Sequence, residues 1–209
     1  MGVPNWLRFK RRDLSTAIVF VIAGVCVRLA LLDFNVPNFE PVMALTIIAS
    51  MVMPLALAVI VPIGIMAVTD TLIYAFNIRG EYGMAMIAGI TFFVWTGFLM
   101  ATLVGWRLKK RYAFRIGNLG MVTGAGVLTT LIFDLWTDIG VWWFSYPAHT
   151  LDDAIRVLQL QTTFTLIHIA SSLIFIPLFG SGYMLLTEHK TGITSPKPVD
   201  EAGRHSGRA

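Results

Sequence analysis

Long apolar runs separated by short polar or charged segments dominate the chain from residue 14 onward. Leu14–Leu32 is the first such run, and Gly83–Trp106, Ile116–Trp136 and Leu158–Leu186 have the same character. About 20 apolar residues of helix are enough to cross the hydrocarbon of a bilayer. Each of these four runs therefore predicts a membrane-spanning helix.

The apolar stretch Val42–Phe76 is longer than one span requires, and Pro54 and Pro62 are its strong helix breakers. The stretch could form one long kinked helix. It could also form a short span over Pro41–Met53 and a longer one over Leu55–Phe76, because the residue before a proline resists helical geometry.

The distribution of basic residues favours two spans in this stretch. Basic residues gather in two clusters, Arg8, Lys10, Arg11 and Arg12 before the first run and Arg107, Lys109, Lys110, Arg111 and Arg115 after the run that ends at Trp106. Lys and Arg concentrate in cytoplasmic segments, so both clusters are expected in the cytoplasm. The chain between them must then cross the membrane an even number of times, which predicts two spans that turn at Met53 and Pro54.

The predicted fold is therefore all-α, a six-helix membrane bundle with both termini in the cytoplasm of a cell whose plasma membrane it crosses. The exterior loops are predicted at Asp33–Glu40, Asn77–Tyr82 and Thr137–Val157. Residues 1–13 would form a basic cytoplasmic N-terminus and residues 14–186 a single membrane domain. Residues 187–209, rich in Pro, Gly, Ser and charge, are predicted to be a disordered cytoplasmic tail.

Composition agrees with this class. Hydrophobic residues make up 56% of the 209 residues and charged residues 13%, whereas soluble domains carry roughly a quarter charged residues. The net charge of +4 comes from residues at the ends of the apolar runs, where charge sets membrane orientation, so nucleic acid is not expected as a partner. No small-residue cleavage site follows Leu14–Leu32, which predicts a retained span and not a signal peptide.

Three charged residues lie within the predicted spans at similar depth, toward the exterior: Arg28, Asp70 and Asp134. Ionisable groups inside membrane helices are costly and usually face the bundle interior or a water-filled cavity. Arg28 could pair with an aspartate as a structural lock, or extend to the headgroups. Alternatively, these side chains could face a ligand.

The last span carries a polar stripe of Gln161, Thr165, His168 and Ser172, whose spacing places them on one helix face. Such a face either hydrogen-bonds to neighbouring helices or lines a cavity. The last exterior loop carries Trp142, Trp143 and Tyr146, which could be interfacial anchors or a lid over an organic ligand.

Other chemistry finds little support in the sequence. His149, Asp152 and Asp153 lack the frame of a metal site, so neither a metal nor another cofactor is predicted. The chain has no zinc-protease, hydrolase or nucleotide-binding motif, so it is not predicted to be an enzyme. An ATP-driven function would need a separate ATPase subunit.

The segment Val36–Leu45 resembles the Pro-Asn-Phe-x-Pro-Val-x-Ala-Leu signature of a prokaryotic membrane family grouped with the substrate-binding S components of energy-coupling-factor (ECF) transporters. Arg28 and Asp70 also match that pattern. Phe133–Trp142, followed by Tyr146 and Pro147, is similar to the family's Phe-x-x-x-Thr-Asn-x-Gly-x-Trp and Tyr-Pro stretch, with Asp138 in place of the usual Asn.

The resemblance implies a six-helix S-component fold that captures a small, vitamin-like organic solute from the exterior. Import would depend on a transmembrane coupling subunit and cytoplasmic ATPase subunits, with membrane lipid around the chain. The residues expected to bind the solute are Arg28, Asn38, Glu40, Asp70, Asp134, Asp138, Trp142, Trp143, Tyr146, Gln161, Thr165 and His168. The alternatives are a non-transporting structural subunit of a larger membrane complex and, third, a membrane enzyme.

Overall fold

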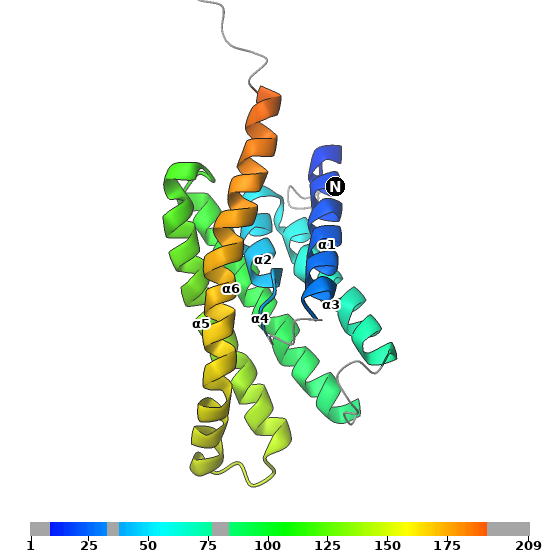
Figure 1. Ribbon diagram of the computed structural model, residues 1–209, viewed down its shortest axis with the longest axis vertical. Coiled ribbons are helices and arrows are strands. Elements are labelled where there is room, and N and C mark those ends of the chain that lie inside the picture. The colour runs from blue at the N-terminus through cyan, green and yellow to red at the C-terminus, as the bar shows by residue number, and fades with distance from the viewer. Residues whose placement is uncertain (1–8, 33–37, 77–83, 192–209) are drawn as a thin grey trace, which may run out of the picture.

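The computed structural model describes residues 9–32, 38–76 and 84–191. These residues form six α-helices in chain order (Figure 1), which confirms the all-α prediction. The helices are α1 (Arg11–Leu32), α2 (Val42–Val52), α3 (Leu55–Ala75), α4 (Met84–Arg111), α5 (Leu119–Ser145) and α6 (Leu151–Thr191), with a short 3₁₀ turn, η2, at Ile116–Asn118.

In the described part of the chain, five of the helices are long and apolar enough to cross a membrane, and α2 is the exception. With 11 residues, α2 is about 16 Å long, which is short of the roughly 30 Å of bilayer hydrocarbon. The chain is thus a multi-pass helical membrane protein. The prediction of six helices is confirmed, whereas only five of them have the length of a full span.

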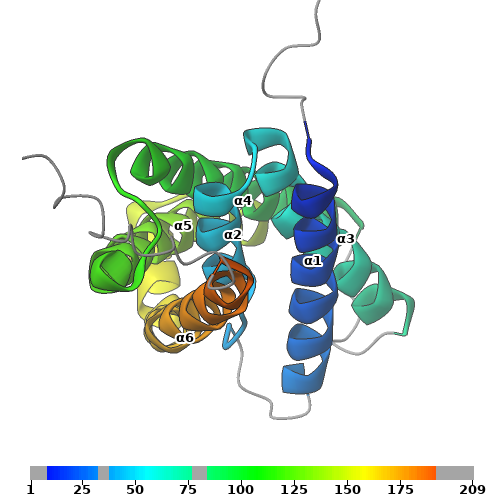
Figure 2. The same cartoon turned by 90° about the horizontal axis from the view of Figure 1, so that it is seen from above.

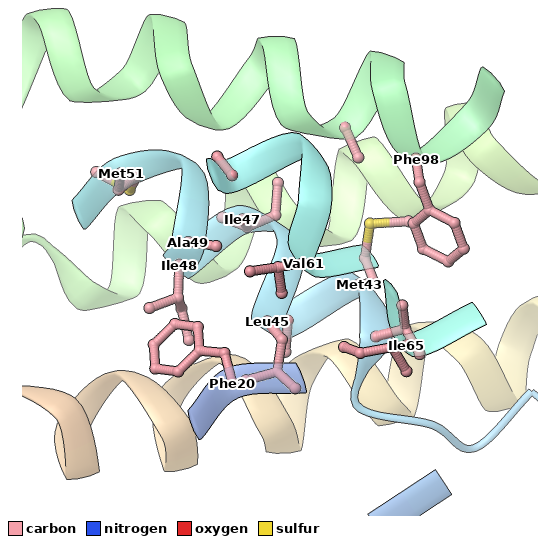
Figure 3. Close-up of a cluster of buried hydrophobic side chains, with 14 of the residues drawn as sticks. Phe20, Met43, Leu45, Ile47, Ile48, Ala49, Met51, Val61, Ile65 and Phe98 are labelled. Carbon is pink, nitrogen blue, oxygen red and sulfur yellow. The ribbon is translucent and has the colours of Figure 1, made fainter. Parts of the chain in front are cut away.

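α2 is the central helix of the molecule. In the end-on view it lies between α1 on one side and α4, α5 and α6 on the other (Figure 2), and it contacts all five other helices. Every residue from Val42 to Met51 is buried. Figure 3 shows side chains of α1, α2, α3 and α4 meeting there, among them Phe20, Leu45, Ile65 and Phe98. A helix enclosed on all sides needs no amphipathic pattern, which explains why its sequence is almost entirely apolar. Its two polar residues, Thr46 and Ser50, donate to backbone carbonyls of the same helix.

The predicted break at Met53 and Pro54 is confirmed. α2 ends at Val52, Met53 adopts an extended backbone, and α3 begins at Leu55. Proline disfavours helical geometry in the residue before it, so the helix stops where the sequence indicates. The second proline, Pro62, lies inside α3 and does not end that helix.

The predicted exterior loop Thr137–Val157 is wrong in extent. α5 continues to Ser145 and α6 already begins at Leu151, so Asp138, Trp142 and Trp143 are helical. The first proline after Thr137 is Pro147, which disfavours a helical Tyr146.

α6 begins early because its first turn is capped. The Thr150 hydroxyl accepts a hydrogen bond from the Asp153 backbone N–H at 3.2 Å, and an Asp153 carboxylate oxygen accepts one from the Thr150 N–H at 3.1 Å. This is a reciprocal capping box. At its other end α6 continues to Thr191, past the predicted start of the tail at residue 187. The rest of that tail, residues 192–209, lies outside the described residues, as do residues 1–8 and the predicted loop Asn77–Tyr82.

The described residues of both basic clusters lie at one end of the bundle. The start of α1, the connection from α4 to α5 and the end of α6 are all at the upper end in Figure 1, and the connection from α5 to α6 is at the opposite end. The Lys109 ammonium donates to the Met53 carbonyl at 2.8 Å, which brings the α2–α3 turn to the same end. This arrangement is the one that an even number of passes between the clusters requires. That this end is cytoplasmic stays a prediction.

Small residues allow the helices to approach closely. A Cβ added to Gly105 of α4 would lie 2.6 Å from the Ser50 Cβ and 3.0 Å from the Ile47 carbonyl oxygen of α2. A Cβ on Gly126 of α5 would lie 2.1 Å from the Ile176 Cδ1 of α6. Because lipid tails are as apolar as the core, membrane helices gain stability from such close van der Waals contact and not from hydrophobic burial.

Candidate functional site

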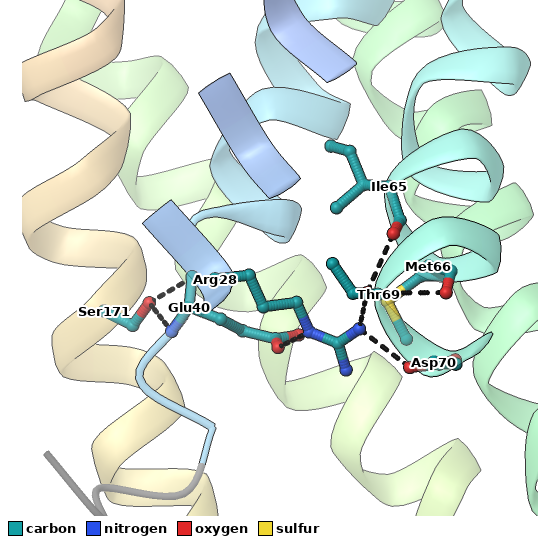
Figure 4. Close-up of polar contacts among 7 residues, drawn as sticks. All are labelled: Arg28, Glu40, Ile65, Met66, Thr69, Asp70 and Ser171. Atoms are coloured by element: carbon teal, nitrogen blue, oxygen red, sulfur yellow. Dashed lines mark hydrogen bonds and ion pairs between the residues drawn. The ribbon is translucent and has the colours of Figure 1, made fainter. Parts of the chain in front are cut away.

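Arg28 of α1 is held between two carboxylates (Figure 4). Its Nε donates to Glu40 Oε2 at 2.6 Å, and its Nη1 donates to Asp70 Oδ1 of α3 at 2.8 Å. The same Nη1 also contacts the Thr69 hydroxyl, which donates in turn to the Ile65 carbonyl at 2.8 Å. The sequence placed Arg28 and Asp70 at a common depth, and the structure brings them together with Glu40.

Glu40 connects this group to α6. Glu40 lies just before α2, and the Ser171 hydroxyl donates to its backbone carbonyl at 2.6 Å and accepts from its backbone N–H at 3.1 Å. Both backbone groups at the entrance to α2 are therefore satisfied by one side chain of α6. Ser171 thus fixes the position from which the Glu40 carboxylate reaches Arg28 (Figure 4).

A second buried pair joins α5 and α6. His168 Nδ1 lies 2.8 Å from Asp134 Oδ1, and their side chains are only 2% and 7% exposed. In the tautomer with its hydrogen on Nδ1, the imidazole donates to this carboxylate oxygen. One turn away, the hydroxyls of Thr130 and Ser172 are 2.8 Å apart.

Two atoms of this pair have no hydrogen-bond partner among the described residues. They are Asp134 Oδ2 and His168 Nε2, and both are buried. Buried polar atoms are nearly always hydrogen-bonded to protein or water, so these two call for a partner. Since no hydroxyl or thiol of the described residues reaches Nε2, the pair lacks the nucleophile of a Ser-His-Asp arrangement.

Asp138 lies one helical turn beyond Asp134 and is also buried. The contacts of Thr130 with Ser172 and of Asp134 with His168 set the antiparallel register of α5 and α6. That register brings Thr165 near the level of Asp138 and Gln161 near that of Trp142. Both α6 residues are half-buried.

The Arg28 group and the Asp134–His168 pair are neighbours along α6, where His168 and Ser171 are three residues apart, and we call the two together the polar belt. It runs from α3 through α1 and the start of α2 to α6 and α5, and its members are Asp70, Thr69, Arg28, Glu40, Ser171, His168, Asp134 and Asp138. The belt contains four carboxylates and one permanent cation, Arg28. Its Arg28 side is the more accessible, with the Arg28, Glu40 and Asp70 side chains 12%, 19% and 21% exposed.

The remaining predicted site residues lie apart from these contacts. Asn38 has a left-handed backbone (φ 60°) in the turn before Glu40, a conformation that Asn tolerates better than most residues. Trp143 is 54% exposed and stacks on His149 with ring centroids 4.4 Å apart. Trp142 is half-buried, and its indole Nε1 has no partner among the described residues. Tyr146 follows the last residue of α5.

Sequence reasoning missed two hydroxyls of the belt, Thr69 and Ser171, and the hydroxyl of Thr130, which contacts Ser172 one turn away. Thr69 adjoins Asp70 in sequence and Ser171 adjoins Ser172 of the polar stripe. The polar residues next to them in sequence were therefore the signal that could have identified these two hydroxyls. A lone Thr or Ser in a membrane helix commonly bonds to its own backbone, as Thr46 does with the Val42 carbonyl.

The fold and the belt define a helical multi-pass membrane protein with charged residues buried across its helices. Residues 9–196 match a family of unknown function (DUF6580), and the chain belongs to that family. No curated protein and no solved structure matches the chain.

Proposed function

We propose that the chain binds a small organic solute at the polar belt, as the substrate-binding subunit of an ECF-type importer or as a solitary relative of one. The observation that carries this proposal is the concentration of Arg28, Glu40, Asp70, Asp134 and Asp138 in one band across the bundle. Ionisable groups within membrane helices are rare and mark substrate and ion pathways more often than other positions do.

Packing alone gives no reason for this band. Close contacts of small residues, such as Gly105 against Ser50, already hold the helices together, and a buried ion pair is often no more stabilising than apolar residues of similar volume. The unpartnered atoms of Asp134 and His168 support the proposal further, because a purely structural network is expected to satisfy its own members.

The importer part of the proposal rests on the resemblance of Val36–Leu45 and Phe133–Trp142 to the ECF-related signature. On this proposal the chain is not itself an enzyme, and it would associate with a transmembrane coupling subunit and cytoplasmic ATPases. Affinity purification from the native host should then recover ATPase subunits, unless the protein works alone.

A second candidate is a non-transporting structural subunit of a larger membrane complex. It is favoured by the geometry of Arg28, whose two hydrogen-bonded carboxylates at 2.6 and 2.8 Å form a compact ion-pair group. In that case the belt would hold α1, α2 and α3 in register and bind nothing.

Native mass spectrometry of gently purified protein separates the two candidates. Solute binding predicts a population whose mass exceeds that of the chain by a small molecule, which is released on collisional activation. A stable assembly that contains neither a small molecule nor an ATPase would favour the structural subunit.

A further inference from the structure

The Asp134–His168 pair leaves two buried atoms, Asp134 Oδ2 and His168 Nε2, without a hydrogen-bond partner among the described residues. In the tautomer that holds the shared hydrogen on Nδ1, 2.8 Å from Asp134 Oδ1, the imidazole has its lone pair at Nε2 and accepts a hydrogen bond there. Asp134 Oδ2 also only accepts. Both atoms are buried without a partner among the described residues, so a group that satisfies them must carry at least two hydrogen-bond donors.

The charge around the pair is negative. Asp138 lies one turn from Asp134 on the same helix and is 9% exposed. Like charges at this spacing repel each other, and burial strengthens the repulsion. Within the described part of the chain Asp138 has no basic partner, and Arg28 is already engaged by Glu40 and Asp70. A positive group between the two aspartates would relieve this repulsion.

An aromatic ring lies one turn further along α5. Trp142 is half-buried, and its Nε1 is also unpartnered among the described residues. An indole beside carboxylates is a common setting for a cation, because the ring face attracts positive charge. The α5 face thus runs from an aromatic residue to two carboxylates, and the second carboxylate contacts the imidazole of α6.

We infer that the Asp134–His168 pair, with Asp138, binds the ammonium group of an organic amine. A primary ammonium carries the positive charge and the several N–H donors that these acceptors lack. The inference rests on the proposed function and deepens it, since it assigns a chemical class to the solute: an organic cation with N–H donors and not an anion or a neutral molecule.

Three matched probes test this assignment by calorimetry on the purified full chain in nanodiscs at neutral pH. Benzylammonium carries charge and donors, benzyltrimethylammonium carries charge without donors, and benzyl alcohol is uncharged. We expect benzylammonium to bind at least tenfold more tightly than either of the others. Asp134→Asn keeps an oxygen for His168 but replaces the unpartnered acceptor by a donor, and should weaken benzylammonium binding about ten- to a hundredfold.

The control is Asp152→Asn, an exposed acid in the first turn of α6, which should leave the affinity unchanged. If Asp134→Asn does not fold, Asp138→Asn must show the same selective loss. Equal binding of benzyl alcohol, or an affinity that neither variant changes, would overturn the ammonium site and leave solute binding standing. If none of the probes binds and no solute co-purifies, both the site and the proposed function fail.

Discussion

Arg28 has a position that no other residue of the described chain shares. Its guanidinium is the single permanent cation of the polar belt, and two carboxylates from different segments converge on it at 2.6 and 2.8 Å. Removing a partner from a buried ion pair costs more than the pair contributes, because a charge is left without compensation. Replacing Arg28 should therefore have the largest effect, since two carboxylates would lose their ion pair with it.

Arg28→Gln should therefore lower the free energy of unfolding by about 3–5 kcal/mol. This loss should appear as a strongly lowered melting temperature. Arg111→Gln is the matched control, because Arg111 is exposed in the last turn of α4 and should change stability by less than about 0.5 kcal/mol. Thermal unfolding in detergent measures both. Equal melting temperatures for the two variants would show that Arg28 is not the centre of a buried group.

Gly105 allows the contact between α2 and α4 to be tested by adding a single carbon atom. An alanine methyl group there would meet Ser50 Cβ at 2.6 Å and the Ile47 backbone oxygen at 3.0 Å, and a backbone atom cannot move aside cheaply. Gly105→Ala should destabilise the protein by about 1–3 kcal/mol. Gly124→Ala, where nothing lies within 4 Å of the added carbon, should be neutral or stabilising by up to about 1 kcal/mol. A neutral Gly105→Ala would contradict the close approach of α2 and α4.

Some of the belt could be predicted residue by residue, and some could not. Arg28, Asp70 and Asp134 stand out because a charge in an apolar run is rare and its depth follows from counting. Which partner each would take was open, since sequence spacing gives depth but not rotation about the helix axis. The contact of Asp134 with His168, and not with Arg28, follows from how α5 packs on α6.

At the scale of elements, α2 is positioned by Glu40, which lies just before it. The Ser171 hydroxyl satisfies both backbone groups of Glu40, so the central helix is anchored to α6 where the chain enters it. α2 itself has an ordinary apolar sequence. Its short length and full burial depend on the five helices around it.

Ser171→Ala should remove the two hydrogen bonds that Ser171 makes to the Glu40 backbone and lower stability by about 1–3 kcal/mol. It should also reduce solute binding, because the Glu40 carboxylate is placed by this anchor. Thr162→Ala on the same helix is the control, since Thr162 is exposed and bonds only to the Leu158 carbonyl of its own helix. If both variants behave alike in thermal unfolding, the anchor is not important.

Helix existence could be predicted better than helix ends. Long apolar runs set the existence of α1, α3, α4, α5 and α6, and prolines set the break between α2 and α3. The polar residues after Trp136 suggested a loop, but Asp138 lies on the buried face of α5 and the helix continues. The capping box of Thr150 and Asp153 was the local signal for the early start of α6.

At the scale of the whole molecule, orientation is the first property to test. Reporter fusions after Lys110 and Ala209 should report cytoplasm, and a fusion within Ser145–Asp152 should report the exterior. The reason is that the described residues of both basic clusters lie at one end of the bundle and the α5–α6 connection lies at the other (Figure 1). An exterior signal after Lys110 would contradict the orientation that positive charge predicts.

Function is the property of the whole molecule that could be predicted least. The belt depends on five segments far apart in sequence, and its chemistry depends on which atoms those segments leave unpartnered. Motif resemblance suggests the class of transporter. The identity of the solute depends on contacts that no spacing rule encodes.

The central claim is that the polar belt binds a solute and does not only lock the helices. The most direct test measures the melting temperature by thermal unfolding and the bound small molecule by native mass spectrometry. It compares the wild type, Asp70→Asn and the triple replacement Arg28→Met, Glu40→Gln, Asp70→Leu. We predict that Asp70→Asn loses most of the bound solute while its melting temperature falls little, because Arg28 keeps Glu40 as a partner. The triple replacement should lose the solute even where it is stable. A triple replacement with wild-type stability and an undiminished bound solute would contradict the account.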